Sequence, residues 1–206
     1  EGMVGWGSAA QVQTHGSARF READKWWAEL TARAEVDDEV NEPGSGLVAF
    51  GSFAFASEPG SSILTVPSVI VGRRGAVAWR TTITAAGAEH ADDGPVEPTI
   101  APADIVFSDG ALDGESWMGV VADAVGRINA GDLEKVVLAR DLIATARDEI
   151  DVRWPLARLA EQYPTCWTFH VDGFFGATPE MLLRRERGLV TSRVLAGTIR
   201  RTGDDE

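Results

Sequence analysis

The chain has 206 residues, 44% of them hydrophobic, and carries a formal net charge of −13 with a sequence pI of about 4.6. This length provides enough apolar material for one sizeable globular domain or two small ones. The acidic surface repels nucleic acid and anionic membranes, so neither is expected as a partner. Because Cys166 is the single cysteine, an intramolecular disulfide and a thiolate metal cluster are both excluded.

The sequence has no apolar run of the ~18 residues that a membrane span needs, and its first residues lack a basic-then-apolar signal pattern. We therefore expect a cytoplasmic protein. The chain begins at Glu1 and ends on the polar residues 203–206, which we interpret as cuts within a longer protein.

The first part of the chain predicts a strand, a helix and a loop. Residues 5–12 are rich in glycine and alanine and indicate an irregular strand. Residues 17–34 carry apolar side chains at steps of three and four, which predicts an amphipathic helix with Ser17 as its N-cap. Residues 37–45 are acidic and contain a Pro-Gly pair, which is typical of a loop.

Three apolar runs separated by short turns follow. The strands that they predict cover residues 46–55, 63–71 and 76–83. Because no helical segment lies between them, we expect antiparallel neighbours rather than a doubly wound parallel sheet. Residues 85–113 are polar and rich in proline, which predicts a surface connection.

The second half of the chain alternates helices and strands. Residues 116–130 predict a helix capped by Ser116, and residues 151–163 predict another. The expected strands cover residues 135–146, 165–171 and 174–176, followed by a hairpin of residues 181–184 and 189–194 around a turn at 186–188. The complete order predicts an α+β fold dominated by antiparallel sheet.

Three short motifs stand out in the second half. They are Glu134-Lys135-Val136-Val137-Leu138, Gly176-Ala177-Thr178-Pro179-Glu180, and Leu195-Ala196-Gly197-Thr198 followed by Arg200 and Arg201. Together they offer an amine that can act as a base and a carboxyl that can act as an acid. The sequences of these motifs resemble those of the chorismate-utilising enzymes, and in particular those of the isochorismate synthases of that family.

The resemblance implies a role for each motif. Lys135 would activate the water that attacks C2 of chorismate, Glu180 would protonate the departing C4 hydroxyl, and Gly197 and Thr198 would contact the substrate. Arg140, Arg193, Arg200 and Arg201 can add positive potential for a dicarboxylate, although most of them are expected to be solvated strand residues. A neutral amine and a protonated carboxyl both need surroundings that oppose their ordinary charge, and the apolar neighbours of Lys135 and Glu180 are expected to exclude water.

Each motif also has a simpler interpretation. A lysine at the edge of an apolar strand often prevents edge-to-edge pairing, and a glutamate after a proline often caps the next element. The Leu195–Thr198 tetrad is compatible with a tight turn. His170, within a predicted strand, is expected to be a hydrogen-bonded core residue rather than a catalyst.

The resemblance further implies layered antiparallel sheets flanked by helices, with residues 1–206 as the N-terminal part of a single chorismate-binding catalytic domain and its C-terminal remainder absent. The resemblance implies Mg²⁺ as the cofactor, bound by glutamates in the later half of the family's sequences and therefore beyond Glu206. Mg²⁺ prefers a nearly octahedral oxygen shell that includes waters and the substrate, which suits bridging a ring carboxylate to protein. The 206 residues alone are therefore expected to be inactive and to expose sheet edges. A monomer is compatible with the full-length protein.

The implied function is Mg²⁺-dependent isomerisation of chorismate to isochorismate for siderophore or menaquinone supply. One alternative is a salicylate synthase of the same family, which also has the lysine and adds pyruvate elimination. Relatives that use ammonia carry glutamine at the position of Lys135, which argues against them. The alternative from another class is a non-catalytic binding or assembly module.

Overall fold

The computed structural model describes residues 1–58, 60–85, 97–195 and 197. They form two compact units, of which unit 1 contains Glu1–Glu97 and Leu159–Glu206, and unit 2 contains Pro98–Arg158. Every strand pairing in the described part is antiparallel, and helices are few, which confirms the predicted α+β class.

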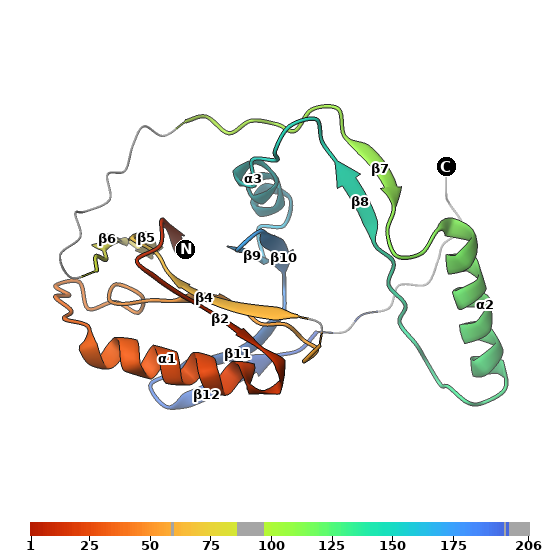
Figure 1. Ribbon diagram of the computed structural model, residues 1–206, viewed down its shortest axis with the longest axis horizontal. Coiled ribbons are helices and arrows are strands. Elements are labelled where there is room, and N and C mark those ends of the chain that lie inside the picture. The colour runs from red at the N-terminus through yellow and green to blue at the C-terminus, as the bar shows by residue number, and fades with distance from the viewer. Residues whose placement is uncertain (59, 86–96, 196, 198–206) are drawn as a thin grey trace. The chain divides into compact units, whose positions relative to one another are not determined.

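The N-terminal part of unit 1 forms two three-stranded sheets (Figure 1). The first has the order β1-β5-β6, with β1 (Gly2–Trp6), β5 (Val69–Arg74) and β6 (Val77–Thr82). The second has the order β2-β4-β3, with β2 (Ala10–His15), β4 (Ser61–Val66) and β3 (Phe50–Ser52). The strand predicted over residues 46–55 is therefore only three residues long.

Pro67 divides the strand that was predicted over residues 63–71. Residues before it pair in one sheet and residues after it pair in the other, so that prediction was wrong. Proline has no N–H for a strand ladder, which ends the pairing of β4. The chain then turns because Ser68 N donates to Trp6 O at 3.0 Å, and Ile83 N donates to Ser68 O at 2.8 Å.

Helix α1 (Arg19–Arg33) confirms the helix predicted over residues 17–34, and it packs on β2 (Figure 1). Ser17 is not its N-cap, because a short 3₁₀ turn, η1 (Gly16–Ala18), moves the cap position to Ala18, which makes no side-chain cap bond. The buried Arg19 instead donates to the carbonyls of Gly16, Ala54 and Phe55, each at 2.9 Å. These bonds fix the start of the helix against the chain after β3.

The hydrophobic core of unit 1 lies between these sheets and α1. Its buried apolar side chains are Ala23, Ile63, Val66, Val69, Ile70 and Trp79. The ring of Trp79 donates from Nε1 to Gly44 O at 3.1 Å, and Thr81 Oγ1 donates to Ser45 O at 2.6 Å. These two bonds hold the predicted loop of residues 37–45 against β6.

Two hairpins complete the described strands of unit 1. One pairs β9 (Trp167–Val171) with β10 (Phe174–Thr178), and the other pairs β11 (Met181–Glu186) with β12 (Leu189–Arg193). Their two-residue turns, Asp172-Gly173 and Arg187-Gly188, have positive φ at both positions, which suits the twist of a tight hairpin. The hairpin prediction for residues 181–194 is confirmed.

Unit 2 contains β7 (Val106–Asp109), α2 (Gly114–Asn129) and β8 (Leu142–Thr145). Strand β7 pairs with β8 and was missed within the predicted surface connection. Asp113, not Ser116, caps α2, because its Oδ1 accepts from Ser116 N at 2.7 Å. Helix α3 (Arg153–Gln162) begins in unit 2 and ends in unit 1.

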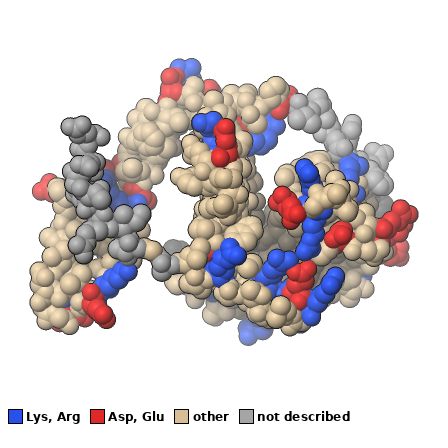
Figure 2. Space-filling view, turned by 180° about the vertical axis from the view of Figure 1, so that it is seen from behind, with Lys and Arg blue, Asp and Glu red and all other residues tan. Residues whose placement is uncertain are grey.

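Burial differs between the two units. No residue of unit 2, all of which the structure describes, is buried. Apolar side chains of α2 are exposed, with Val125 at 49% and Ile128 at 37%. No helix in the described ranges is long and apolar enough to cross a membrane. Basic and acidic side chains lie interspersed over the face seen in Figure 2.

Candidate functional site

Glu180 lies at the junction between two hairpins of unit 1. It follows Thr178, the last residue of β10, and precedes Met181, the first of β11. The two strands belong to different two-stranded sheets, so the chain changes sheets at Pro179-Glu180. Glu180 N donates to Thr178 Oγ1 at 3.1 Å, which fixes the backbone on both sides of the proline.

The carboxylate of Glu180 contacts the third motif. Its Oε1 accepts from Leu195 N at 2.9 Å. Pairing of Met181 with Arg193 returns the chain after β12 to the start of β11, which explains why these residues meet. The structure thereby brings the predicted acid to within two residues of Gly197. Thr198, the other predicted substrate contact, lies outside the described residues, as do Arg200 and Arg201.

The expected burial of Glu180 is wrong for this chain. Glu180 is exposed, and among the apolar neighbours that were expected to exclude water from it, Phe174 and Phe175 are 62% and 40% exposed. A two-stranded hairpin has no second layer to cover its faces, so its apolar side chains remain accessible. Phe174 contacts Phe169 across the hairpin, with ring centroids 5.4 Å apart.

Lys135 lies in unit 2, between α2 and β8, and is exposed. The strand predicted over residues 135–146 is reduced to β8, so Lys135 does not project from a strand and is not in dry surroundings. The physical reason is the shortness of β7, which offers only four pairing positions. Lys135 and Glu180 thus belong to different units, and their pairing across one substrate stays a prediction.

Side chains rather than a strand ladder hold the residues just before β8. Arg140 pairs with Asp109 and donates from Nε to Leu112 O at 3.2 Å. The carboxylate of Asp141 accepts from Ala111 N at 3.0 Å. These bonds join Arg140 and Asp141 to residues 109–112, which precede α2. Arg140 therefore has a structural role here, beside the substrate role expected from the sequence.

Two other residues singled out from the sequence make local contacts in unit 1. His170 is exposed rather than in the core, but it is hydrogen-bonded as expected, since its Nε2 accepts from Gly173 N at 3.2 Å. The guanidinium of Arg193 lies over the ring of Trp167, 5.7 Å from its centroid. Both contacts stabilise the hairpins.

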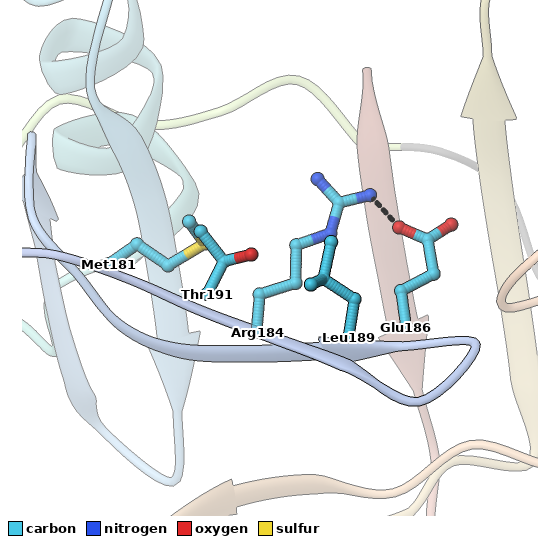
Figure 3. A pocket seen from close by; sticks show the side chains of 5 residues that line it. All are labelled: Met181, Arg184, Glu186, Leu189 and Thr191. Carbon is cyan, nitrogen blue, oxygen red and sulfur yellow. Dashed lines mark hydrogen bonds and ion pairs between the residues drawn. The ribbon is translucent and has the colours of Figure 1, made fainter.

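A shallow concavity on the β11–β12 hairpin was missed in the sequence. Met181, Arg184, Glu186, Leu189 and Thr191 line it, and Figure 3 shows these side chains together on one side of the hairpin. Glu186 pairs with Arg184 and, at 3.5 Å, with Arg74 of β5. The hydrogen bond from Arg184, with its charge and that of Arg74, lowers the pKa of Glu186. The ion pair between Glu186 and Arg74 at this concavity is a structural contact between β11 and β5.

A β-bulge produces this arrangement. The register shifts by one residue between Met181 and Arg184, so that these two side chains share a face although they are three positions apart. Without the bulge, Met181 would point to the opposite face from Arg184. The sequence signal for it is weak, because the run Met181-Leu182-Leu183 has no alternation.

Among the described residues, no group of three or more His, Cys, Asp or Glu side chains is arranged to hold a metal ion. The carboxylate of Glu180 is engaged with a backbone N–H, and that of Glu186 with two guanidinium groups. The residues described here therefore do not form a Mg²⁺ site by themselves.

A family model described as chorismate binding enzyme matches residues 1–206. The chain belongs to this family. It is 28% identical to isochorismate synthase MenF of Bacillus subtilis over 99% of the chain and 50% of the relative. It is 38% identical to isochorismate synthase EntC of Escherichia coli over 42% of the chain and 23% of the relative.

A relative from Pseudomonas aeruginosa, named salicylate biosynthesis isochorismate synthase, is 27% identical over 97% of the chain and 47% of its own length. A solved structure described as isochorismate synthase DhbC from Bacillus anthracis matches with a TM-score of 0.57 and 22% identity. The match covers 98% of the chain and 48% of that structure, and it confirms the fold. The chain thus spans about half the length of the relatives that it matches most fully.

Proposed function

We propose that this chain supplies the base, the acid and part of the substrate contact of an isochorismate synthase, which converts chorismate to isochorismate. Residues 1–206 would form the N-terminal part of a single catalytic domain. Family membership across the whole chain and relatives named isochorismate synthase support this proposal. The product would supply siderophore or menaquinone synthesis.

The hydrogen bond between Glu180 and Leu195 N is the structural observation that supports the proposal most directly. A carboxyl that protonates a leaving group must lie beside the residues that hold the substrate. Glu180 is hydrogen-bonded to Leu195, which lies two residues before Gly197, the proposed substrate contact.

In the proposed reaction, Lys135 in its neutral form takes a proton from water as the oxygen attacks C2 of chorismate. The ring double bonds shift, the bond from C4 to its hydroxyl oxygen breaks, and Glu180 gives its proton to that oxygen. One water is consumed and one is released, so the atoms balance. Lys135 then carries the proton that Glu180 must regain, which permits turnover in both directions.

The composition favours a chemical role for Lys135. The chain has 17 arginines but only two lysines, Lys25 and Lys135. Arginine serves equally well as a solvated cation, but its guanidinium does not lose a proton in proteins, whereas an amine can. A lysine at this motif position is therefore the residue that a general base requires.

The proposal keeps Mg²⁺ as the cofactor, with ligands in the part of the relatives' length that this chain does not span. A Mg²⁺ ion bound by carboxylates and substrate would neutralise a substrate carboxylate. Since the described residues form no such site, no role in binding the ion is assigned to Lys135 or Glu180.

The test is to replace each residue in the full-length protein and measure chorismate turnover in both directions. Lys135→Arg keeps the charge but removes the base, and Lys25→Arg makes the same change on α1. Glu180→Ala removes the acid, and Glu39→Ala is its control in an exposed loop. We expect losses of about 10²- to 10⁴-fold at Lys135 and Glu180 and none at the controls.

Chromatography of the products decides between the related functions. Isochorismate alone would support the proposal, and the P. aeruginosa relative, although named for salicylate biosynthesis, is itself called an isochorismate synthase. Salicylate and pyruvate would indicate the salicylate synthase alternative. Unchanged turnover in both Lys135→Arg and Glu180→Ala, or no turnover in the wild type, would refute the proposed function and favour a non-catalytic module.

A further inference from the structure

Thr178 is hydrogen-bonded to Glu180, although the sequence analysis assigned no role to Thr178 within its motif. Its hydroxyl oxygen accepts from Glu180 N at 3.1 Å. Pro179 between them has no N–H, so Glu180 carries the first backbone donor after the strand. Thr178 is half-buried and pairs with Trp167 of β9, which anchors it in the β9–β10 hairpin.

Glu180 is therefore held at both ends. Its backbone N–H bonds back to Thr178, and its carboxylate bonds forward to Leu195 N at 2.9 Å. These two bonds connect β10 to the residue that precedes Ala196-Gly197. Pro179 limits φ to about −65°, so the remaining freedom of the Glu180 backbone lies largely in torsions that the Thr178 bond restricts.

We infer that Thr178 is a positioning residue for Glu180: its hydroxyl fixes the backbone from which the carboxyl reaches Leu195 N. This inference rests on the proposed function, because it assigns Thr178 a part in proton transfer by Glu180. Thr178 itself acts through Glu180 and not on the substrate. A side chain that is held in place loses less rotational freedom when the transition state forms.

Local turn stabilisation alone would account for the same hydrogen bond, because threonine hydroxyls often bond to a backbone N–H two residues on. The two roles differ in their consequences. A residue that only stabilises the turn would affect unfolding, whatever stands at position 180. A positioning residue would affect turnover only while the acid is present.

The experiment uses the full-length protein and a double-mutant cycle. Thr178→Val keeps the shape of the side chain but removes the acceptor, and Thr178→Ser keeps the acceptor. Thr168→Val is the matched control, since Thr168 is a half-buried threonine of the same hairpin with no side-chain hydrogen bond within the described ranges. Each change is also made in a Glu180→Gln background, and kcat, KM and the unfolding midpoint are measured for all variants.

We expect Thr178→Val to lower kcat about tenfold with KM nearly unchanged, because an interaction that matters only in the transition state lowers kcat and kcat/KM together. Thr178→Ser should stay within about threefold of the wild type, as should Thr168→Val. In the Glu180→Gln background, Thr178→Val should cause less than a twofold further loss, because residues that act as a unit are not additive.

The inference is overturned if Thr178→Val keeps the wild-type kcat, if Thr178→Ser is as impaired as Thr178→Val, or if the loss is equally large in the Glu180→Gln background. If Thr178→Val fails to fold, Thr178→Ala is compared with Thr178→Ser in its place, with the same outcomes. A strong loss in Glu180→Gln alongside an unaffected Thr178→Val would reject this inference and leave the proposed function intact. Full activity of Glu180→Gln would reject both.

Discussion

Gly72 of β5 permits the close packing of Trp79, and its replacement by alanine tests the core of unit 1. A Cβ at position 72 would lie 2.2 Å from Trp79 Cε2 and 2.3 Å from Cζ2. Carbon atoms in contact are about 3.5 to 4.0 Å apart, so the indole would have to move by more than about 1 Å. That movement would also break the bond from Trp79 Nε1 to Gly44 O, now 3.1 Å.

The expected cost has two parts. Overpacking a well-filled site costs about 1 to 3 kcal/mol, and a lost hydrogen bond costs about 1 kcal/mol. Gly72→Ala should therefore lower the free energy of unfolding by about 2 to 4 kcal/mol. Gly46→Ala is the control, because its Cβ would find its nearest neighbours at 3.7 Å, in ordinary contact. Urea unfolding followed by tryptophan fluorescence measures both variants.

A second variant isolates the steric cause. Trp79→Leu removes the ring that alanine would strike, so Gly72→Ala should cost little in that background. The reasoning is refuted if Gly72→Ala unfolds at the wild-type urea midpoint with an unchanged near-ultraviolet circular dichroism spectrum. It is also refuted if its cost is the same with and without Trp79.

The structure supports three further predictions. Ile70→Ala should cost about 2 to 5 kcal/mol in urea unfolding, because Ile70 is fully buried, whereas Val36→Ala at an exposed site should cost little. Arg19→Met should lower the unfolding midpoint and leave the Ala54 and Phe55 carbonyls without this donor, whereas Arg21→Met should not. The side-chain hydrogen bond from Arg153 lowers the pKa of Asp151 from 3.8 to about 2. The contribution of this carboxylate to the stability of the folded protein is therefore complete above pH 3.8 and is lost as pH falls through about 2. Acid unfolding of Asp151→Asn should lack this component, and an unchanged acid profile would contradict it.

Local sequence signals predicted the helices and the turns well. The spacing of apolar residues correctly predicted helices α1 and α2, because this periodicity depends only on residues that are close in the sequence. Cap positions were wrong by one to three residues, since a 3₁₀ turn precedes α1 and Asp113 outcompetes Ser116 at α2. Such shifts depend on backbone geometry that residue type alone does not determine.

Strand lengths were harder to predict because they depend on a partner. The run predicted as a strand over residues 135–146 has strand-like composition throughout, but β7 pairs with only four of its residues, Leu142–Thr145. Pro67 could have been recognised as a break from its missing N–H, although the change of sheet at that point depends on long-range packing. The amino-acid composition of these segments does not determine which strand each of them pairs with.

The contact between Glu180 and Leu195 was accessible to sequence reasoning but was missed. A two-residue turn at Arg187-Gly188 pairs Glu186 with Leu189, and counting back along both strands places Glu180 opposite Leu195. The bulge shifts the register by one residue but keeps them adjacent. The predicted hairpin had a three-residue turn at 186–188, which would place Glu180 opposite Val194. The prediction therefore brought the two motifs close together but did not give this contact between residues 15 positions apart.

The exposure of Lys135 and Glu180 sets a condition on the proposed function. Acid/base catalysis near neutral pH needs surroundings that oppose the ordinary charge of both groups, and residues 1–206 provide such surroundings for neither. Since the matched relatives are about twice as long, we propose that residues outside this chain cover both groups. The 206 residues alone should then show no chorismate turnover although their hairpins form. Turnover by them would show that an exposed amine and carboxyl suffice, and the requirement for burial would be wrong.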